Sequence, residues 1–91
     1  MDNTLKHIVL DWIPSQSKVI DFGCGDGALL KILFEQKSII GYGVENDPDK
    51  INACIINGVS VIQQDIDAGI HNYKGMGFDV AVMASSIQCL R

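Results

Sequence analysis

Residues 18–28 read KVIDFGCGDGA, and this stretch decides how the neighbouring segments are interpreted. A short apolar run that includes one acid, Asp21, is followed by glycine at every second position: Gly23, Gly25 and Gly27. The pattern predicts a buried strand that stops, turns sharply and opens a helix, because glycine leaves no side chain between the backbone and a ligand. We call the three glycines and the two residues between them the glycine turn, and expect a nucleotide derivative to bind there.

Helix and strand patterns alternate on both sides of the glycine turn. Helices are predicted at 3–13, 28–36 and 48–57, and strands at 19–22, 39–44, 59–62 and 78–83. A loop is expected at 69–77, and a further helix is expected to begin within 84–91. This alternation at short spacing predicts one α/β domain over residues 1–91, with right-handed crossovers and a parallel sheet covered on both faces.

Apolar spacing and capping residues predict which helix faces are buried. In the first helix the apolar face is expected to consist of Leu5, Ile8, Val9 and Trp12. The third helix has clear boundary signals: Asp47 as the N-cap, Pro48 at the first helical position and Gly58 as a left-handed terminator. Its buried face is expected to consist of Ile51, Cys54 and Ile55.

Composition excludes several classes of protein. The net charge of −4 and the scattered positions of the seven Lys and Arg residues disfavour nucleic-acid binding. No apolar run approaches the roughly 20 residues of a membrane-spanning helix, and no export signal is visible, so we expect a soluble cytoplasmic protein. Three distant cysteines fit neither a disulfide framework nor a metal site, and Cys24 is interpreted as a small filler residue.

Acids follow the predicted strands where parallel strands end. Glu45 lies 22 residues after Gly23, where a carboxylate can accept hydrogen bonds from both hydroxyls of a ribose; the alternative is a solvated charge before a helix. Asp65 follows the third strand and could accept from an adenine amino group, although acids are common in loops. The glycine pattern through Ala28 also fits nicotinamide and flavin dinucleotide sites, but Asp21 would face a pyrophosphate unfavourably.

Residues 19–27 resemble the first motif of the class I S-adenosylmethionine-dependent methyltransferases, and segments 41–45, 53–55, 58–69 and 78–80 further resemble the methionine-biosynthesis family MetW. The resemblance implies a Rossmann-like fold and S-adenosylmethionine as cofactor, with S-adenosylhomocysteine as the product if a methyl group is transferred. The cofactor-binding residues that it implies are Asp21, Gly23, Cys24, Gly25, Gly27, Glu45, Asn46, Asp65 and Ile66. It identifies no catalytic residue.

Members of the family continue beyond the fourth strand, so residues 1–91 are expected to supply only the N-terminal half of the fold, with strand order 3-2-1-4. The missing half normally completes the substrate pocket, which leaves catalysis by these residues alone in doubt. The resemblance also implies homoserine O-acetyltransferase as a partner, so a non-catalytic regulatory or accessory subunit is an alternative function. A nicotinamide-dinucleotide-binding domain is a further alternative. An open edge on the fourth strand would predict self-association.

Overall fold

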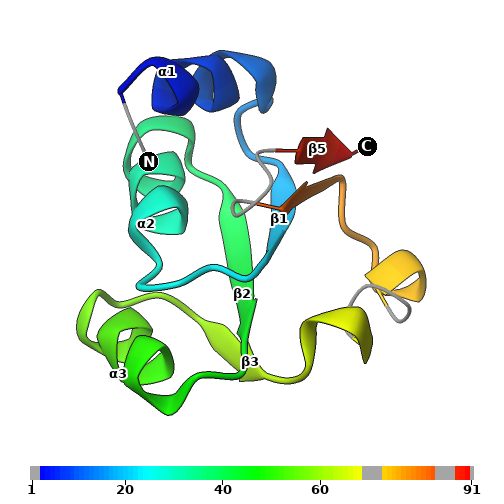
Figure 1. Ribbon diagram of the computed structural model, residues 1–91. Helices are drawn as coiled ribbons and strands as arrows, with labels where there is room; N and C mark the ends of the chain where they lie inside the picture. The colour runs from blue at the N-terminus through cyan, green and yellow to red at the C-terminus, as the bar shows by residue number, and fades with distance from the viewer. Residues whose placement is uncertain (1–2, 69–72, 84–87, 91) are drawn as a thin grey trace.

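The chain folds as an α/β sheet with helices packed against it, as the computed structural model shows for residues 3–68, 73–83 and 88–90 (Figure 1). In chain order the elements are α1 (Asn3–Trp12), β1 (Lys18–Phe22), α2 (Ala28–Lys37), β2 (Ile40–Glu45), α3 (Pro48–Ile56), β3 (Val61–Gln63), the 3-10 turn η1 (Tyr73–Gly75), β4 (Val80–Met83) and β5 (Gln88–Leu90). The predicted alternation of strands and helices is confirmed, although β3 and β4 each begin two residues later than predicted.

The sheet has the strand order β3-β2-β1-β4-β5. β1 lies at its centre and pairs in parallel with β2 and β4, while β3 pairs in parallel with β2. The predicted parallel order 3-2-1-4 is therefore confirmed. It brings the carboxyl ends of β1, β2 and β3 to one edge of the sheet, where open α/β folds bind their ligands.

The end of the described chain differs from the expectation. Gln88–Leu90 form β5, antiparallel to β4, with Leu90 opposite Ala81; the helix expected within 84–91 is wrong for these three residues, and 84–87 and 91 lie outside the described residues. A returning segment satisfies the N–H and C=O groups on the free side of β4. Because β4 is bonded to β1 on one side and to β5 on the other, the open edge from which self-association was predicted is absent.

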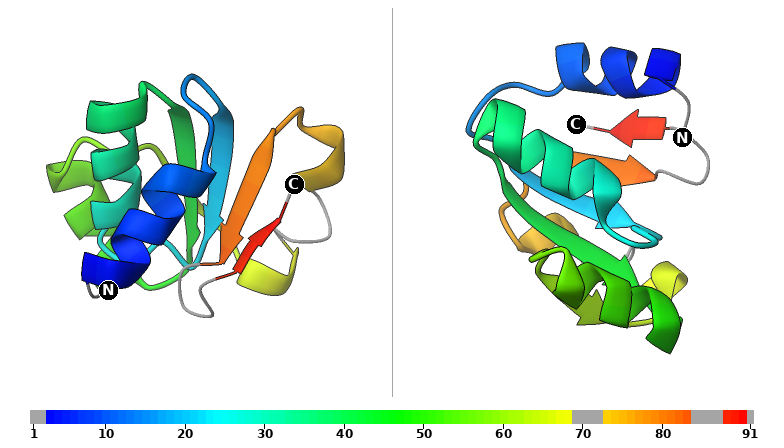
Figure 2. Two further views of the ribbon diagram at one scale, coloured as in Figure 1. Left: turned by 90° about the horizontal axis from the view of Figure 1, so that it is seen from above. Right: turned by 90° about the vertical axis from the view of Figure 1, so that its left-hand side faces the viewer.

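The two faces of the sheet are covered differently. Figure 2 shows α1, α2 and α3 on one face, where they bury the larger apolar cluster around Val19, Leu33 and Val80. The opposite face holds a smaller cluster around Phe22 and Val44, covered by η1 and the residues that precede β4. Both faces are covered as predicted, and the glycine turn emerges on the helical side.

The buried stripe of α1 is displaced from its predicted position. Val9, Leu10 and Ile13 are buried, whereas Ile8 and Trp12, predicted to face inward, are 56% and 41% exposed. In α3, Cys54 is buried as predicted but Ile55 is 62% exposed. When apolar residues occupy adjacent helical positions, periodicity does not decide which of them faces the sheet.

Candidate functional site

The glycine turn bends back against the end of β2. Gly23, Gly25 and Gly27 have φ angles of 75°, 60° and 80°, in the left-handed region that costs any residue with a Cβ atom. The N–H groups of Gly23 and Cys24 both donate to the carbonyl of Val44, at 2.8 and 3.3 Å. The glycines are therefore required by the backbone path that takes the chain from β1 over the end of β2.

The glycine turn delivers the chain directly into α2. Gly27 is the N-cap and offers no side-chain acceptor, while Asp26 Oδ1 accepts from the Ala28 N–H at 3.0 Å. The first turn of α2 contains no acidic residue. Its amino terminus, with the partial positive charge of the helix dipole, thus borders the turn.

Glu45 ends β2 and is brought onto the glycine turn. Its side chain is only 7% exposed, and Oε1 accepts from the Gly25 N–H at 3.1 Å. Oε2 accepts from the N–H groups of Asn46 and Asp47, at 3.1 and 3.2 Å. A carboxylate offers about four lone-pair positions, so three are used here and one on Oε1 remains. The alternative of a solvated charge before a helix is wrong for Glu45.

Asp21 is enclosed in the central strand. It is fully buried, opposite Gly43 of β2 and Val82 of β4. Side chains alternate along a strand, so Asp21 lies on the same helical side of the sheet as Val19. After burial and the neighbouring Cys54 thiol, the Asp21 charge is a further cause that raises the pKa of Cys24.

Cys24 and Cys54 lie against each other beneath the glycine turn. Their Sγ atoms are 3.6 Å apart, and a Cβ atom at Gly43 would overlap the Cys24 side chain. Burial is the main cause that raises the pKa of both thiols above the ordinary value of 9.0. A buried, protonated thiol is a poor nucleophile, which agrees with the interpretation of Cys24 as a filler residue.

The other predicted site residues lie at the same edge of the sheet without touching the turn. The Gln64 N–H donates to the Glu45 carbonyl at 3.1 Å, so the chain after β3 passes the end of β2. Asp65 is exposed and Oδ2 accepts from the Ala68 N–H at 3.4 Å, while Ile66 packs on the opposite face of the sheet. Within the described residues, no hydrogen bond joins Asp65 to the glycine turn.

Two side chains that were not among the predicted site residues bond the glycine turn from α3 and its end. Cys54 Sγ donates to the Gly25 carbonyl at 3.0 Å, and Asn57 Nδ2 donates to the Asp26 carbonyl at 2.9 Å. Their three-residue spacing places both on one side of the helix, which was a usable signal. Nothing in the local pattern indicates, however, that this side meets the turn after β1.

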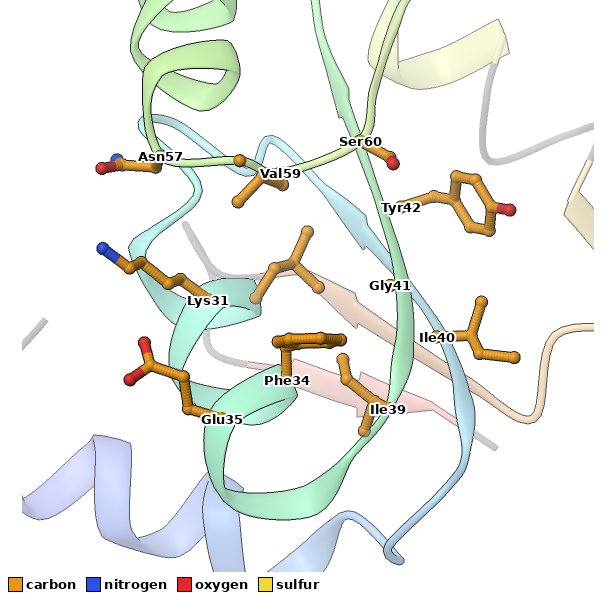
Figure 3. Close-up of a pocket in the computed structure, with 12 residues that line it drawn as sticks. Lys31, Phe34, Glu35, Ile39, Ile40, Gly41, Tyr42, Asn57, Val59 and Ser60 are labelled. Carbon is orange, nitrogen blue, oxygen red and sulfur yellow. The ribbon is translucent and has the colours of Figure 1, made fainter.

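An apolar hollow of about 540 Å³ lies beside the amino-terminal half of β2 (Figure 3), and two residues that line it, Asn57 and Val59, also border the glycine turn. β3 pairs only with Gly43–Glu45, so the start of β2 has no strand on that side. The lining comes from α2, the start of β2 and residues 57–60, including Phe34 and Ile40. The hollow contains none of the predicted cofactor residues.

Two further findings concern metals and membranes. Over the described parts of the chain, no group of three or more His, Cys, Asp or Glu side chains could hold a metal ion. No helix in the same residues is long and apolar enough to cross a membrane.

Comparison of the sequence with models of protein families identifies the family of this chain. The family model described as methionine biosynthesis protein MetW matches residues 4–91. The chain belongs to the MetW family. The match includes the glycine turn, Glu45 and α3, so the geometry above is that of a MetW chain.

One relative links MetW to a larger protein. The bifunctional methionine biosynthesis protein MetXA/MetW of Rhodopirellula baltica is 27% identical to this MetW chain over 96 residues. The alignment covers 97% of this chain and 15% of the relative, so the chain spans about a seventh of the relative's length. Family and relative agree that this is a MetW-like protein linked to methionine biosynthesis.

Proposed function

We propose that this MetW chain binds S-adenosylmethionine at the glycine turn, as the nucleoside-binding part of a methyltransferase-like protein. The observation that carries the proposal is the position of Glu45: a buried carboxylate directly bonded to the Gly25 N–H. A carboxylate in this position can accept from ribose hydroxyls, and Gly25 beside it has no side chain that would block a ligand. Asp65 at the neighbouring strand end is proposed as an acceptor for the adenine amino group.

Asp21 favours a sulfonium ligand over a dinucleotide. It is a buried acid next to the glycine turn, so a pyrophosphate bound there would meet a like charge in a poorly solvated place. S-adenosylmethionine instead carries a sulfonium and an amino group, both positive. If a methyl group is transferred, the protein's contribution is to orient the acceptor in line with the sulfonium. We propose no catalytic residue.

Calorimetric titration with S-adenosylhomocysteine tests the site. Glu45→Ala is expected to weaken binding about tenfold or more, because a hydrogen bond to a charged acceptor is lost. Glu35→Ala is the matched control. Glu35 is exposed on α2, so this substitution removes the same charge at a position away from the glycine turn. Equal affinity of the Glu45 variant and the unaltered chain would overturn the ribose assignment. Tighter binding of NAD than of S-adenosylhomocysteine would support the dinucleotide alternative.

A regulatory subunit is the second candidate function, and the relative favours it. The relative's name joins MetXA and MetW in one bifunctional protein. The proposed partner is homoserine O-acetyltransferase, with S-adenosylmethionine as a sensed signal. Co-purification of the two proteins without methyl transfer to any small acceptor would support this function. Failure to form a complex at micromolar concentrations would count against it.

A further inference from the structure

Two consecutive carbonyl groups of the glycine turn are bonded by the same segment. The Gly25 carbonyl accepts from the Cys54 thiol, and the Asp26 carbonyl accepts from the Asn57 side-chain amide. Cys54 lies in the last turn of α3 and Asn57 is its C-cap. The side chains of Cys54 and Asn57 therefore set the orientation of two peptide groups in the glycine turn between β1 and α2.

The Cys54 thiol is protonated and can serve as a donor. Cys54 has no exposed surface, and burial raises its pKa, an effect that the hydrogen bond from Cys24 partly offsets. A thiol has one proton. Because Cys54 donates its proton to the Gly25 carbonyl at 3.0 Å, it can only accept in the 3.6 Å contact with the Cys24 thiol, which also lies 3.8 Å from the Gly25 carbonyl. The result is a chain of two donors that ends on the turn.

The orientation of the Gly25 carbonyl also fixes the next N–H group. A trans peptide is planar, and its C=O and N–H bonds point in opposite directions. Because the Gly25 carbonyl is directed at α3, the Asp26 N–H is directed away from it. The Gly25 N–H is separately held by Glu45. The N–H groups of Gly25 and Asp26 are thus oriented by side chains from outside the turn, whereas the Gly27 N–H donates to the Cys24 carbonyl within it.

We propose that Cys54 and Asn57 are positioning residues for the cofactor: they hold the Gly25 and Asp26 carbonyls toward α3 and so keep the glycine turn in its binding shape. This inference rests on the proposed function, in which the ligand at the turn is S-adenosylmethionine. Neither residue is proposed to touch the ligand. Their effect on binding is transmitted through the orientation of two peptide groups.

The matched variants are Cys54→Ala and Cys54→Ser. Both remove the sulfur atom and leave side chains of similar volume, but only serine keeps a hydrogen-bond donor. Titration with S-adenosylhomocysteine should show affinity about fivefold weaker for Cys54→Ala, the effect of one neutral hydrogen bond. Cys54→Ser should bind within about twofold of the unaltered chain. Asn57→Ala should resemble Cys54→Ala.

A second readout does not require the ligand. Amide hydrogen exchange at Gly25 and Gly27 reports the order of the turn, because these N–H groups bond Glu45 and the Cys24 carbonyl. Exchange should be faster in Cys54→Ala than in Cys54→Ser. If the unaltered chain does not bind S-adenosylhomocysteine, the proposed function fails. If it binds and the alanine and serine variants have equal affinity and equal exchange, the positioning role is overturned while the proposed function stands.

Discussion

The units β1–α2 and β2–α3 have the same strand–turn–helix architecture but start their helices by different means. In the first, left-handed glycines make the connection and the N-cap, Gly27, has no side chain to offer. In the second, Glu45 Oε2 accepts from two N–H groups, Asp47 Oδ1 accepts from the Asp49 N–H at 3.0 Å, and Pro48 occupies the first helical position. The start of α2 has one side-chain acceptor, Asp26 Oδ1 on the Ala28 N–H, whereas two carboxylates, Glu45 and Asp47, cover the start of α3.

The difference separates the proposed ligand site from a purely structural connection. Carboxylates at the start of α3 satisfy N–H groups and the helix dipole internally, so a ligand has little to add there. The glycine turn before α2 keeps side chains away from its backbone. It also depends on the second unit, because Glu45, Cys54 and Asn57 all bond it. Rigidity in one unit therefore supports the geometry of the other.

The largest expected effect is that of Gly27→Ala. A Cβ atom at Gly27 would lie 2.9 Å from Val59 Cγ2, and its φ of 80° is strained for alanine. Strain and overlap together should lower the free energy of unfolding by about 3 kcal/mol. Gly58→Ala at the end of α3 is the control, because φ is 75° but nothing lies within 4 Å; about 1 kcal/mol is expected. Urea unfolding measures the free energy of unfolding of both variants. An equal decrease in the two would show that overlap with Val59 does not contribute.

A smaller effect is expected from pH, through the thiols that join the two units. The folded-state pKa values of Cys24 and Cys54 are raised above 9.0. The two protonated thiols therefore make their full contribution to the free energy of unfolding below pH 9. This contribution falls at higher pH, because the thiols of the unfolded chain lose their protons first. From pH 8 to pH 10 the free energy of unfolding should fall by about 1.4 kcal/mol through Cys24, and Cys54 should add to this loss in the same direction.

The control for the pH effect is the double variant Cys24→Ser and Cys54→Ser. It retains every other titrating group, so the difference between its urea unfolding curves and those of the unaltered chain isolates the two thiols. Parallel pH dependence in the two proteins would contradict a buried, protonated pair.

The smallest effect is expected from the helix caps. Asp47→Ala removes the acceptor of the Asp49 N–H and should cost about 1 kcal/mol of stability. Asp26→Ala removes the acceptor of the Ala28 N–H, which is exposed at the start of α2, and should cost about 0.5 kcal/mol. Thermal unfolding by circular dichroism can rank the two. A larger loss of stability for Asp26→Ala than for Asp47→Ala would show that the cap at the start of α2 is the more important of the two.

The sequence predicted those features that local chemistry decides. Alternating glycines predicted the turn, because no other residue adopts three left-handed φ angles at low cost. Asp47 and Pro48 predicted the start of α3, and Gly58 its termination. Alternation of strands and helices predicted a parallel sheet with right-handed crossovers, whereas the strand order 3-2-1-4 was implied by the resemblance to the methyltransferase family.

Features that depend on distant partners were not predicted. Gln88–Leu90 form β5 because β4 offers a free edge, a tertiary effect that overrides local preference. Ile55 is exposed because the neighbouring Cys54 takes the inward position against Cys24. The bonds of Cys54 and Asn57 to the turn join residues about 30 positions apart, and no local pattern marks such a pair.

The shared use of Glu45 has a kinetic consequence. With three of about four lone-pair positions already taken, Oε1 has one position free and Oε2 has none, so a diol that engages both oxygens has to displace the N–H of Asn46 or Asp47 from Oε2. Ligand entry and rearrangement of the segment between β2 and α3 are then one linked event. The association rate of such a ligand would level off at high concentration, at the rate at which Asn46 or Asp47 releases the Glu45 carboxylate.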